Sequence, residues 1–330
     1  MESNNWNFIK IKIFEGESMS DICVLGSVNM DVVIKVDDMP AVGETIKAKE
    51  IKKICGGKGA NQAVAVARLG GNVSFIGCIG KDENGEILLE TLKREKIDTK
   101  TIRLDDNLPT GVAYIIVDKK GKNLILVYSG MNSDLNENDV YNNKEVIANS
   151  KILISQLEIP INTVIKAFKI AKENKVITIL NPSPVSDIPD ELYRLCDIII
   201  PNEMEAERLT GIYPATLSDI EKIGEFFYHK SIKISIITLG ERGSAVYYNG
   251  KINIVPSIQV NVIDTTAAGD TFIGAFAWQL SKTDELTFEK LCKIVELANK
   301  VAAISVTKEG AQSSIPYLSE VIGMYGSVDI

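Results

Sequence analysis

Apolar runs of strand length alternate with segments of helical periodicity along most of this chain. The apolar runs predict buried strands at residues 22–28, 73–80, 151–158, 176–181, 197–202 and 233–240. Apolar residues at helical spacing predict amphipathic helices near residues 59–69, 87–96, 161–168, 190–196, 203–210, 218–230, 269–281 and 287–306. This alternation predicts an α/β fold in which a mostly parallel sheet has helices on both faces.

Two pairs of strand-like segments have no helix between their members. Residues 31–36 and 45–54 form one pair, and residues 111–118 and 123–129 form the other. They predict a small separate β-sheet that lies as a lid over a site. The predicted organisation is an N-terminal extension at residues 1–20, an α/β domain at 21–320 with the lid at about 31–54 and 111–129, and a C-terminal tail at 321–330.

Charge and cysteine content exclude several classes of protein. The formal net charge of the 330 residues is -8, which argues against a general nucleic-acid binder, since phosphate binding needs clustered Lys and Arg. The five cysteines are widely spaced, and no C-x-x-C pair occurs, so we expect reduced thiols in the cytoplasm. No apolar run reaches the roughly 18 residues of a membrane span, and the N-terminus is too polar for a signal peptide.

His229 is the only histidine of the chain and lies near the end of a predicted helix. We interpret it as a surface residue. A single histidine excludes H-E-x-x-H zinc sites, which need two, and its interpretation as a surface residue argues against Ser-His-Asp chemistry.

The segment 262–276 is the strongest candidate for chemistry. A predicted strand ends at Asp264, and the small residues 265–269 lead into a helix that begins near Asp270. Small residues let backbone N–H groups approach an anion, and a helix N-terminus adds a positive partial charge, which suits a phosphoryl group. A carboxylate beside such a site suits a general base. The alternative is that Asp270 only caps the helix.

A glycine-rich turn at residues 55–58 precedes the first predicted helix. The turn lacks the glycine and hydroxyl positions of a P-loop and the last glycine of the dinucleotide fingerprint, which excludes a nicotinamide-dependent oxidoreductase. Lys58 and Asn61 suit the binding of a polyhydroxyl compound. The alternative is a tight turn before a core helix.

Two further pairs of polar residues are candidate ligands. Asn29 and Asp31 follow the first core strand, where a carboxylate can bind a vicinal diol, although such residues are also common turn formers. Asn202 and Glu205 lie three apart at a helix start and can hold hydrated Mg²⁺, although charged residues there are more often solvated.

Taken together, these segments resemble the PfkB carbohydrate kinase family over about residues 22–318. The resemblance rests on GSVNMD, PAVGET, GGKGANQAVAVARLG, QLE, LNPSP, PNEMEAERLTG, ITLGERG, DTTAAGDTFIGA and VTKEGAQSSIP, in family order. The run at residues 264–270 is the family's most diagnostic motif, and GGKGANQ is close to its ribokinase branch. The resemblance implies a Rossmann-like α/β fold with a small β-sheet lid that pairs two subunits into a homodimer.

The resemblance also implies an activity, ATP-dependent phosphorylation of D-ribose at its 5-hydroxyl, with Asp270 as the general base. The implied anion hole is Ala267, Ala268 and Gly269. The implied ribose ligands are Asn29, Asp31, Gly57, Lys58, Asn61, Glu158 and Asp270. The implied ATP-binding residues are Asn202, Thr238, Gly240, Gly243, Gly269 and Asn299. Mg²⁺ enters with ATP and is held through water by Glu205. An activating K⁺ is ligated, largely through backbone carbonyls, by Asp264, Thr266, Ser305, Lys308, Gly310 and Ser314.

Two alternatives to ribose phosphorylation stay open. One is a kinase of the same family that acts on deoxyribose or a nucleoside, and the other is a sugar-binding regulator without catalysis. Asn29 and Asp31 favour ribose, because a sugar that lacks a hydroxyl leaves a buried acceptor without a partner. Ser305 and Lys308 depart from the side chains that the family often has at these positions.

Overall fold

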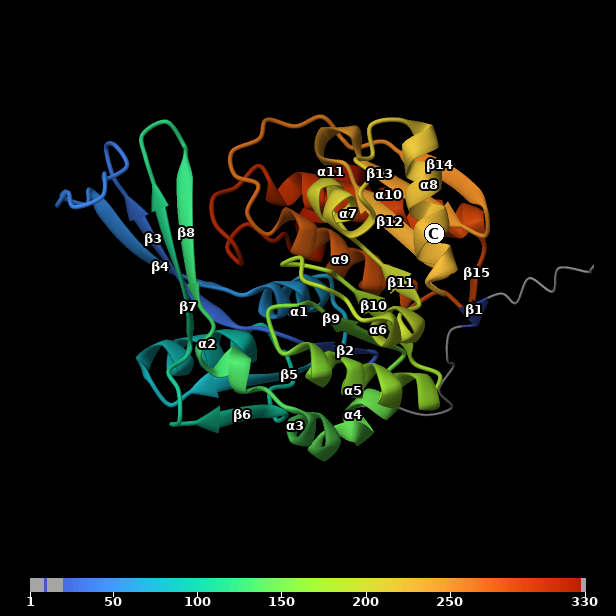
Figure 1. Ribbon diagram of the computed structural model, residues 1–330, viewed down its shortest axis with the longest axis horizontal. Coiled ribbons are helices and arrows are strands. Elements are labelled where there is room, and N and C mark those ends of the chain that lie inside the picture. Colours follow the sequence, from blue (N-terminus) through green and yellow to red (C-terminus); the bar gives the residue numbers. More distant parts are fainter. Residues whose placement is uncertain (1–8, 11–19, 328–330) are drawn as a thin grey trace, which may run out of the picture.

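The computed structural model describes residues 9–10 and 20–327. In this part of the chain, nine strands form the central sheet, in the order β14-β13-β12-β11-β10-β9-β2-β5-β6 (Figure 1). Neighbours from β12 to β6 are parallel, and β13 and β14 complete one edge as antiparallel strands. The strands are β2 (Ile22–Leu25), β5 (Val73–Gly80), β6 (Ile102–Asp105), β9 (Ile152–Ser155), β10 (Ile177–Leu180), β11 (Ile198–Ile199), β12 (Ile234–Thr238), β13 (Ser244–Tyr248) and β14 (Lys251–Val255).

Helices cover both faces of the sheet, as the alternation of elements predicts. One face packs against α1 (Lys58–Arg68), α2 (Glu83–Arg94), α9 (Ala268–Leu280), α10 (Phe288–Ser305) and α11 (Leu318–Tyr325). The other packs against η1 (Gly130–Asp134), α3 (Glu137–Asn142), α4 (Lys144–Ala148), α5 (Ile161–Glu173), α6 (Asp190–Leu195), α7 (Glu203–Thr210) and α8 (Leu217–His229). In β2, for example, Val24 packs on the first face and Leu25 on the second, because successive strand residues point to opposite faces.

The predicted lid is a separate sheet. Within the described residues it has four strands, in the order β4-β3-β7-β8, and it projects from one side of the molecule (Figure 1). The strands are β3 (Asn29–Lys35), β4 (Glu50–Gly56), β7 (Gly111–Val117) and β8 (Asn123–Tyr128). The prediction of strand at residues 45–49 is wrong, because this segment leaves the sheet and β4 begins at Glu50.

The predicted strand ending at Asp264 is also wrong. Residues 256–264 form no strand, and the backbone N–H groups of Ile263 and Asp264 both donate to the carbonyl of Val306, just beyond α10. The segment is tied to a helix end rather than to a neighbouring strand, which leaves the turn before α9 accessible.

The structure adds detail at both predicted terminal boundaries. Part of the predicted extension forms β1 (Ile9–Lys10). This strand pairs antiparallel with β15 (Glu285–Leu286), which lies in the segment of the chain between α9 and α10. Most of residues 1–20 and the last three residues lie outside the described part. Helix α11 (Leu318–Tyr325) crosses the predicted boundary between domain and tail. Val321, the first residue of the predicted tail, is buried in the core, so this helix belongs to the domain. Among the described residues, no helix is long and apolar enough to span a membrane.

Candidate active site

The N-terminus of α9 combines an open turn with a carboxylate. The N-cap residue Ala267 has a left-handed backbone (φ 60°), which directs the chain into the helix. A Cβ added to Gly269 would meet no described atom within 4 Å, so the turn opens on free space. The N–H of Ala268 donates to the carbonyl of Thr265 at 3.2 Å. The first N–H groups of a helix have no acceptor within the helix, so this turn can bind an anion, foremost at Gly269.

Asp270 is buried, and α1 holds its carboxylate. Nδ2 of Asn61 donates to Oδ2 at 3.0 Å, and Nε2 of Gln62 donates to Oδ1 at 3.0 Å. Burial raises the pKa of Asp270 above its ordinary value, whereas the charge of Lys58 and the two hydrogen bonds act to lower it. The capping alternative is wrong, because the carboxylate bonds to another helix and makes no cap hydrogen bond. A buried carboxylate with a raised pKa is suited to accept a proton.

Lys58 lies among four carboxylates. Burial acts against its charge, but the attraction of Asp270, Glu158, Glu205 and Asp31 raises its pKa. Burial, followed by repulsion from Glu158 and Asp270, raises the pKa of Asp31 to about 7, and Lys58 acts in the opposite direction. A partly buried site with excess negative charge favours a ligand that brings hydrogen-bond donors. The hydroxyl groups of a sugar are such donors.

Two glycines let the residues predicted to bind a sugar converge. A Cβ at Gly56 would lie 2.2 Å from Oδ2 of Asp31, so a larger residue there would displace this carboxylate. Gly57 has a φ of 89° and is the N-cap of α1. Oε2 of Glu158 accepts a hydrogen bond from the backbone N–H of Lys58 at 3.2 Å. The glycine-rich turn therefore begins a core helix and also gathers the polar residues of the lid, the turn and the sheet.

Asn29 is held by Asn132, which the sequence analysis missed. Nδ2 of Asn132 donates to Oδ1 of Asn29 at 2.7 Å and to the carbonyl of Val28 at 3.1 Å. Oδ1 of Asn132 accepts from the N–H of Val28 at 3.0 Å. Asn132 lies in η1, a short helix without a hydrophobic period, so the sequence carries no local signal for this contact.

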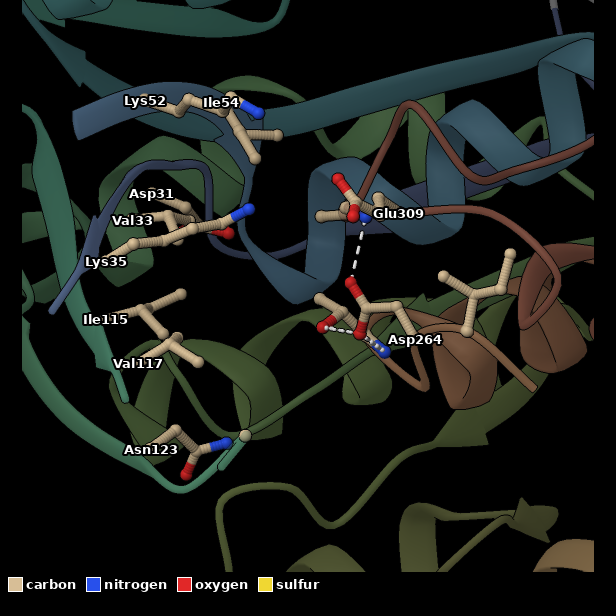
Figure 2. Close-up of a pocket in the computed structure, with 15 residues that line it drawn as sticks. Asp31, Val33, Lys35, Lys52, Ile54, Ile115, Val117, Asn123, Asp264 and Glu309 are labelled. Carbon is tan, nitrogen blue, oxygen red and sulfur yellow. Dashed lines mark hydrogen bonds between the residues drawn. The ribbon is translucent and has the colours of Figure 1, made fainter. Parts of the chain in front are cut away.

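A cavity of about 370 Å³ lies between the lid and the loops at 263–266 and 309–311 (Figure 2). Asp31 lines it from the lid, and Asp264 lines it from the turn before α9. The lid also contributes an apolar wall, formed by Val33, Ile54, Ile115 and Val117. Of the predicted sugar ligands, Asp31 lines this cavity, and the lid adds the polar side chains of Lys35, Lys52 and Asn123 to its apolar wall.

Asp264 ties together two loops that the sequence separates. Its Oδ1 accepts from the N–H of Thr266 at 2.9 Å and from the hydroxyl of Thr266 at 2.6 Å, and its Oδ2 accepts from the N–H of Gly310 at 2.9 Å (Figure 2). Partial burial acts to raise the pKa of Asp264, but these hydrogen bonds outweigh it and the pKa is lowered. The side chain is thus an ionised link between the turn before α9 and the loop after α10.

The other residues of the predicted cation site have side chains bonded to protein groups. The hydroxyl of Ser305 donates to the carbonyl of Ala302, and that of Ser314 donates to the carbonyl of Ala311. Lys308 forms an ion pair with Glu320. Backbone carbonyls therefore remain as the candidate ligands from these residues.

A second cavity, of about 190 Å³, lies at the N-terminus of α9. Its wall includes Lys58, Asn202, Glu205, Thr238, Ala267, Ala268, Gly269 and Asp270. Asn202 and Glu205 form a capping box on α7: Oδ1 of Asn202 accepts from the N–H of Glu205 at 2.8 Å, and Oε2 of Glu205 accepts from the N–H of Asn202 at 2.9 Å. The alternative of solvated side chains is wrong for Glu205, because its carboxylate is buried and burial raises its pKa.

The remaining residues predicted to bind ATP lie around the turn after β12. Gly240 and Gly243 have φ values of 56° and 96°, and a Cβ at Gly243 would lie 2.1 Å from the carbonyl oxygen of Val255. Asn299 is buried on α10, where its Nδ2 donates to that carbonyl at 3.1 Å and its Oδ1 accepts from the hydroxyl of Ser244 at 2.7 Å. Asn299 thus holds the edge strands β13 and β14 in place, while Thr238 lines the smaller cavity.

Comparisons with known proteins agree with this geometry. Residues 19–318 match the pfkB family carbohydrate kinase profile. The chain is 42% identical over 301 residues to a ribokinase of Staphylococcus aureus, with 91% of this chain and 98% of the relative covered. It is 45% identical over 301 residues to a ribokinase of Haemophilus influenzae, with 91% and 97% covered. The solved structure of Arabidopsis thaliana ribokinase complexed with ribose and ATP has a TM-score of 0.85 at 32% identity, with 92% and 98% covered.

Proposed function

Because this chain belongs to the pfkB family of carbohydrate kinases, we propose that it transfers the γ-phosphoryl group of ATP to the 5-hydroxyl of D-ribose. One observation carries the proposal. The buried carboxylate of Asp270 lies on the first turn of α9, beside an anion-binding turn, and in electrostatic contact with Lys58, Glu158 and Asp31, of which Asp31 lines the larger cavity. This arrangement brings a proton acceptor, a phosphate-binding turn and a polyol site together.

The reaction needs one proton transfer and one displacement. Asp270 removes the proton of the 5-hydroxyl as its oxygen forms a bond to the γ-phosphorus, and the bond from that phosphorus to the β-phosphate oxygen breaks to release ADP. In this mechanism the backbone N–H groups of Ala267, Ala268 and Gly269 stabilise the developing negative charge, with Ala268 giving up its hydrogen bond to the carbonyl of Thr265, and the positive end of α9 adds to their effect. The mixed acidic and basic surroundings of Asp270 keep it basic enough for this task.

Sugar selection follows from the acceptors of the site. Asp31 and Glu158 accept hydrogen bonds from ribose hydroxyls, Lys58 donates, and Asn29 and Asn61 add amide groups. Oδ1 of Asn61 is buried and has no partner among the described residues, so a small rotation of this side chain would offer an unused acceptor to a sugar hydroxyl. Deoxyribose would leave such an acceptor without a partner in a buried site, which disfavours it. Gly57 contributes its backbone, because no side chain fits beside it.

Mg²⁺ fits the smaller cavity. A buried carboxylate, that of Glu205, lines this cavity opposite the anion-binding turn, and Mg²⁺ commonly keeps waters and takes one or two carboxylates. When bound with ATP, the ion neutralises charge on the phosphate oxygens. Asn202 orients Glu205 through the capping box, and Thr238 lines the same cavity, so the turn that runs from Thr238 to Gly243 would border a bound nucleotide.

A monovalent cation such as K⁺ fits the two loops that Asp264 joins. The donor set is one ionised carboxylate together with backbone carbonyls, and such hard oxygen ligands suit this kind of ion. The proposed ligands are Asp264, Thr266, Ser305, Lys308, Gly310 and Ser314. A bound cation would stabilise the loop that leads into α9.

We also propose a homodimer in which two lids pair. All six residues of β8 are exposed, including Leu126 at 58% and Ile125 at 53%. A long apolar edge strand with free backbone groups is a surface that pairs with another chain. The five cysteines are free thiols, which supports the cytoplasm as the compartment.

A coupled assay of ADP release tests the function. Purified protein with MgATP and K⁺ is given ribose, deoxyribose, fructose, adenosine or pseudouridine. We expect ribose to have the highest kcat/KM. Deoxyribose or a nucleoside equal to ribose would favour the alternative substrates, and binding of ribose without any ADP release would favour a non-catalytic regulator.

A further inference from the structure

The catalytic carboxylate is joined to two glutamines that the proposed reaction does not use. Gln62 on α1 donates from Nε2 to Oδ1 of Asp270 at 3.0 Å. Gln156, directly after β9, donates from Nε2 to Oε1 of Gln62 at 2.6 Å. Both glutamine side chains belong to residues with 0% exposure. The contacts form a relay from the sheet through α1 to α9, and each member lies on a different element.

The relay determines which end of the Gln62 amide faces Asp270. An amide has one oxygen that accepts and one nitrogen that donates. The ionised carboxylate of Asp270 only accepts, and Nε2 of Gln156 donates to Oε1 of Gln62, so both neighbours place the donor end of Gln62 at Asp270. Oε1 of Gln156 has no partner among the described residues, so the orientation of the Gln156 amide depends on this same contact. Oδ1 of Asn181, at 3.4 Å from Nε2 of Gln62, favours the same orientation of the Gln62 amide. Rotation of the Gln62 amide would bring two oxygens together at Asp270 and two nitrogens together at Gln156, which burial makes costly.

The backbone leaves space for this arrangement. Gly26 follows β2, and β2 pairs with β9 so that Leu25 lies beside Ser155. Gly26 therefore lies beside Gln156, and a Cβ on Gly26 would be 2.1 Å from Oε1 of Gln156 and 2.9 Å from Cα of Gly59. A glycine at this position lets the glutamine lie between the end of the sheet and the start of α1.

The two oxygens of Asp270 differ in their surroundings. Oδ1 is held by Gln62, which has no route to the sugar because it is fully buried. Oδ2 is held by Asn61, whose own Oδ1 has no partner among the described residues and which belongs to the proposed sugar ligands. A substrate bound by Asn61 would compete for its contact with Oδ2, whereas Gln62 is not among the proposed sugar ligands.

We propose that Gln62, oriented by Gln156, is a positioning residue that anchors Oδ1 of Asp270, stabilises the ionised carboxylate and leaves Oδ2 to take the proton of the sugar hydroxyl. The inference rests on the proposed kinase function and adds the route by which the fold holds its general base. Charged groups also face Asp270 from other elements: Lys58 from α1, Glu158 beyond β9, Asp31 from β3 and Glu205 from α7. Of these, only Lys58 favours the ionised form, so the hydrogen bond of Gln62 adds to a single attractive charge.

The test compares Gln62→Leu and Gln156→Leu with the parent enzyme in steady-state kinetics across pH 5–9. For Gln62→Leu we expect kcat to fall about tenfold or more and the acid limb of the kcat profile to move to higher pH, because the ionised base loses a donor. KM for ribose should change much less than kcat. Gln62→Asn keeps the amide on a shorter side chain. Relative to Gln62→Leu, it should restore less of the parent kcat than Gln62→His, whose side chain can place a donor farther from the backbone.

A double-mutant cycle tests the role of Gln156. If Gln156 acts only through Gln62, the loss of kcat in Gln156→Leu disappears in the Gln62→Leu background. Additive losses would overturn the relay. Gln279→Leu, at a buried position near the far end of α9, is the matched control and should leave the acid limb unchanged.

The remaining outcomes also decide the question. A Gln62→Leu enzyme with the kcat and the acid limb of the parent would overturn the proposal. A Gln62→Leu enzyme that melts at a lower temperature, but whose folded fraction has the pH profile of kcat that the parent has, would overturn it as well. If Gln62→Leu does not fold, Gln156→Met, which keeps a similar length and removes the donor without adding a charge, must shift the acid limb or the proposal fails. A parent enzyme that phosphorylates no sugar would instead refute the proposed function.

Discussion

Asp264 accepts a hydrogen bond at Oδ2 from the backbone N–H of Gly310 at 2.9 Å, although 46 positions separate the two residues in the chain. The contact joins the turn before α9 to the loop after α10. Both segments border the larger cavity and supply the proposed ligands of a monovalent cation. The geometry of the anion-binding turn is therefore connected to the loop that we propose to bind the cation.

We expect Asp264→Ala to lose most of the stimulation by K⁺. The variant removes the only ionised ligand of the proposed set and releases both loops. The parent enzyme should be faster in K⁺ than in Na⁺, and the variant should be slow and nearly equal in both salts. Initial rates at constant ionic strength measure this effect, with the exposed Asp187→Ala as the control. Equal parent rates in the two salts would count against the cation site.

Asp270→Asn should lower kcat by about 10²–10⁴-fold, because general-base catalysis contributes on that order. The amide keeps the shape of the side chain but cannot accept the proton. Binding of ATP, measured by titration calorimetry, should stay close to that of the parent, because the carboxylate does not hold the nucleotide. Full turnover by the variant would refute the assigned mechanism.

KM for ribose should rise as pH falls below about 7. Burial raises the pKa of Asp31 to about 7, so the free site becomes protonated below that pH and loses an acceptor for the sugar. The limiting dependence is about tenfold per pH unit, because one proton is displaced on binding. Asp31→Asn should bind ribose weakly with a flat pH dependence of KM, whereas Asp106→Asn in an exposed turn should behave as the parent.

Gly56→Ala should weaken sugar binding more than nucleotide binding. A Cβ at this position would be 2.2 Å from Oδ2 of Asp31, so the carboxylate or the lid strand must move. We expect KM for ribose to rise about tenfold or more, while KM for ATP changes little. Gly323→Ala on α11 is the control, because a Cβ there meets no described atom within 4 Å. An unchanged KM for ribose would show that the site tolerates the displacement.

Leu126→Asp should convert the proposed dimer into a monomer. A charge in the middle of the exposed strand β8 opposes pairing of two lids. Light scattering coupled to gel filtration should give twice the chain mass of 36.1 kDa for the parent and the single mass for the variant. Tyr228→Lys, an exposed aromatic position on α8, should leave the mass unchanged. A monomeric parent would contradict the lid-pairing proposal.

Sequence analysis predicted the layers of the fold because their signals are local. Runs such as residues 73–80 identify strands fully buried on both faces, and the period of residues 60–67 identifies a helix with one buried face. Segments with neither signal were not predicted, namely β6, η1, α3 and α4. The predicted strand before Asp264 failed because alternation alone does not supply a partner strand, and this segment bonds to the end of α10 instead.

The sequence alone identified the residues proposed to carry chemistry, because Asp270, Lys58 and Asp31 lie in short motifs whose backbone form and side-chain types are set locally. Only the tertiary structure decided how they act on one another. Lys58 comes to lie among four carboxylates, and Gln156 orients Gln62 against Asp270, because β9, α1 and α9 converge at one end of the sheet. Electrostatic and hydrogen-bond energies depend on distance and burial, and packing of remote segments sets both.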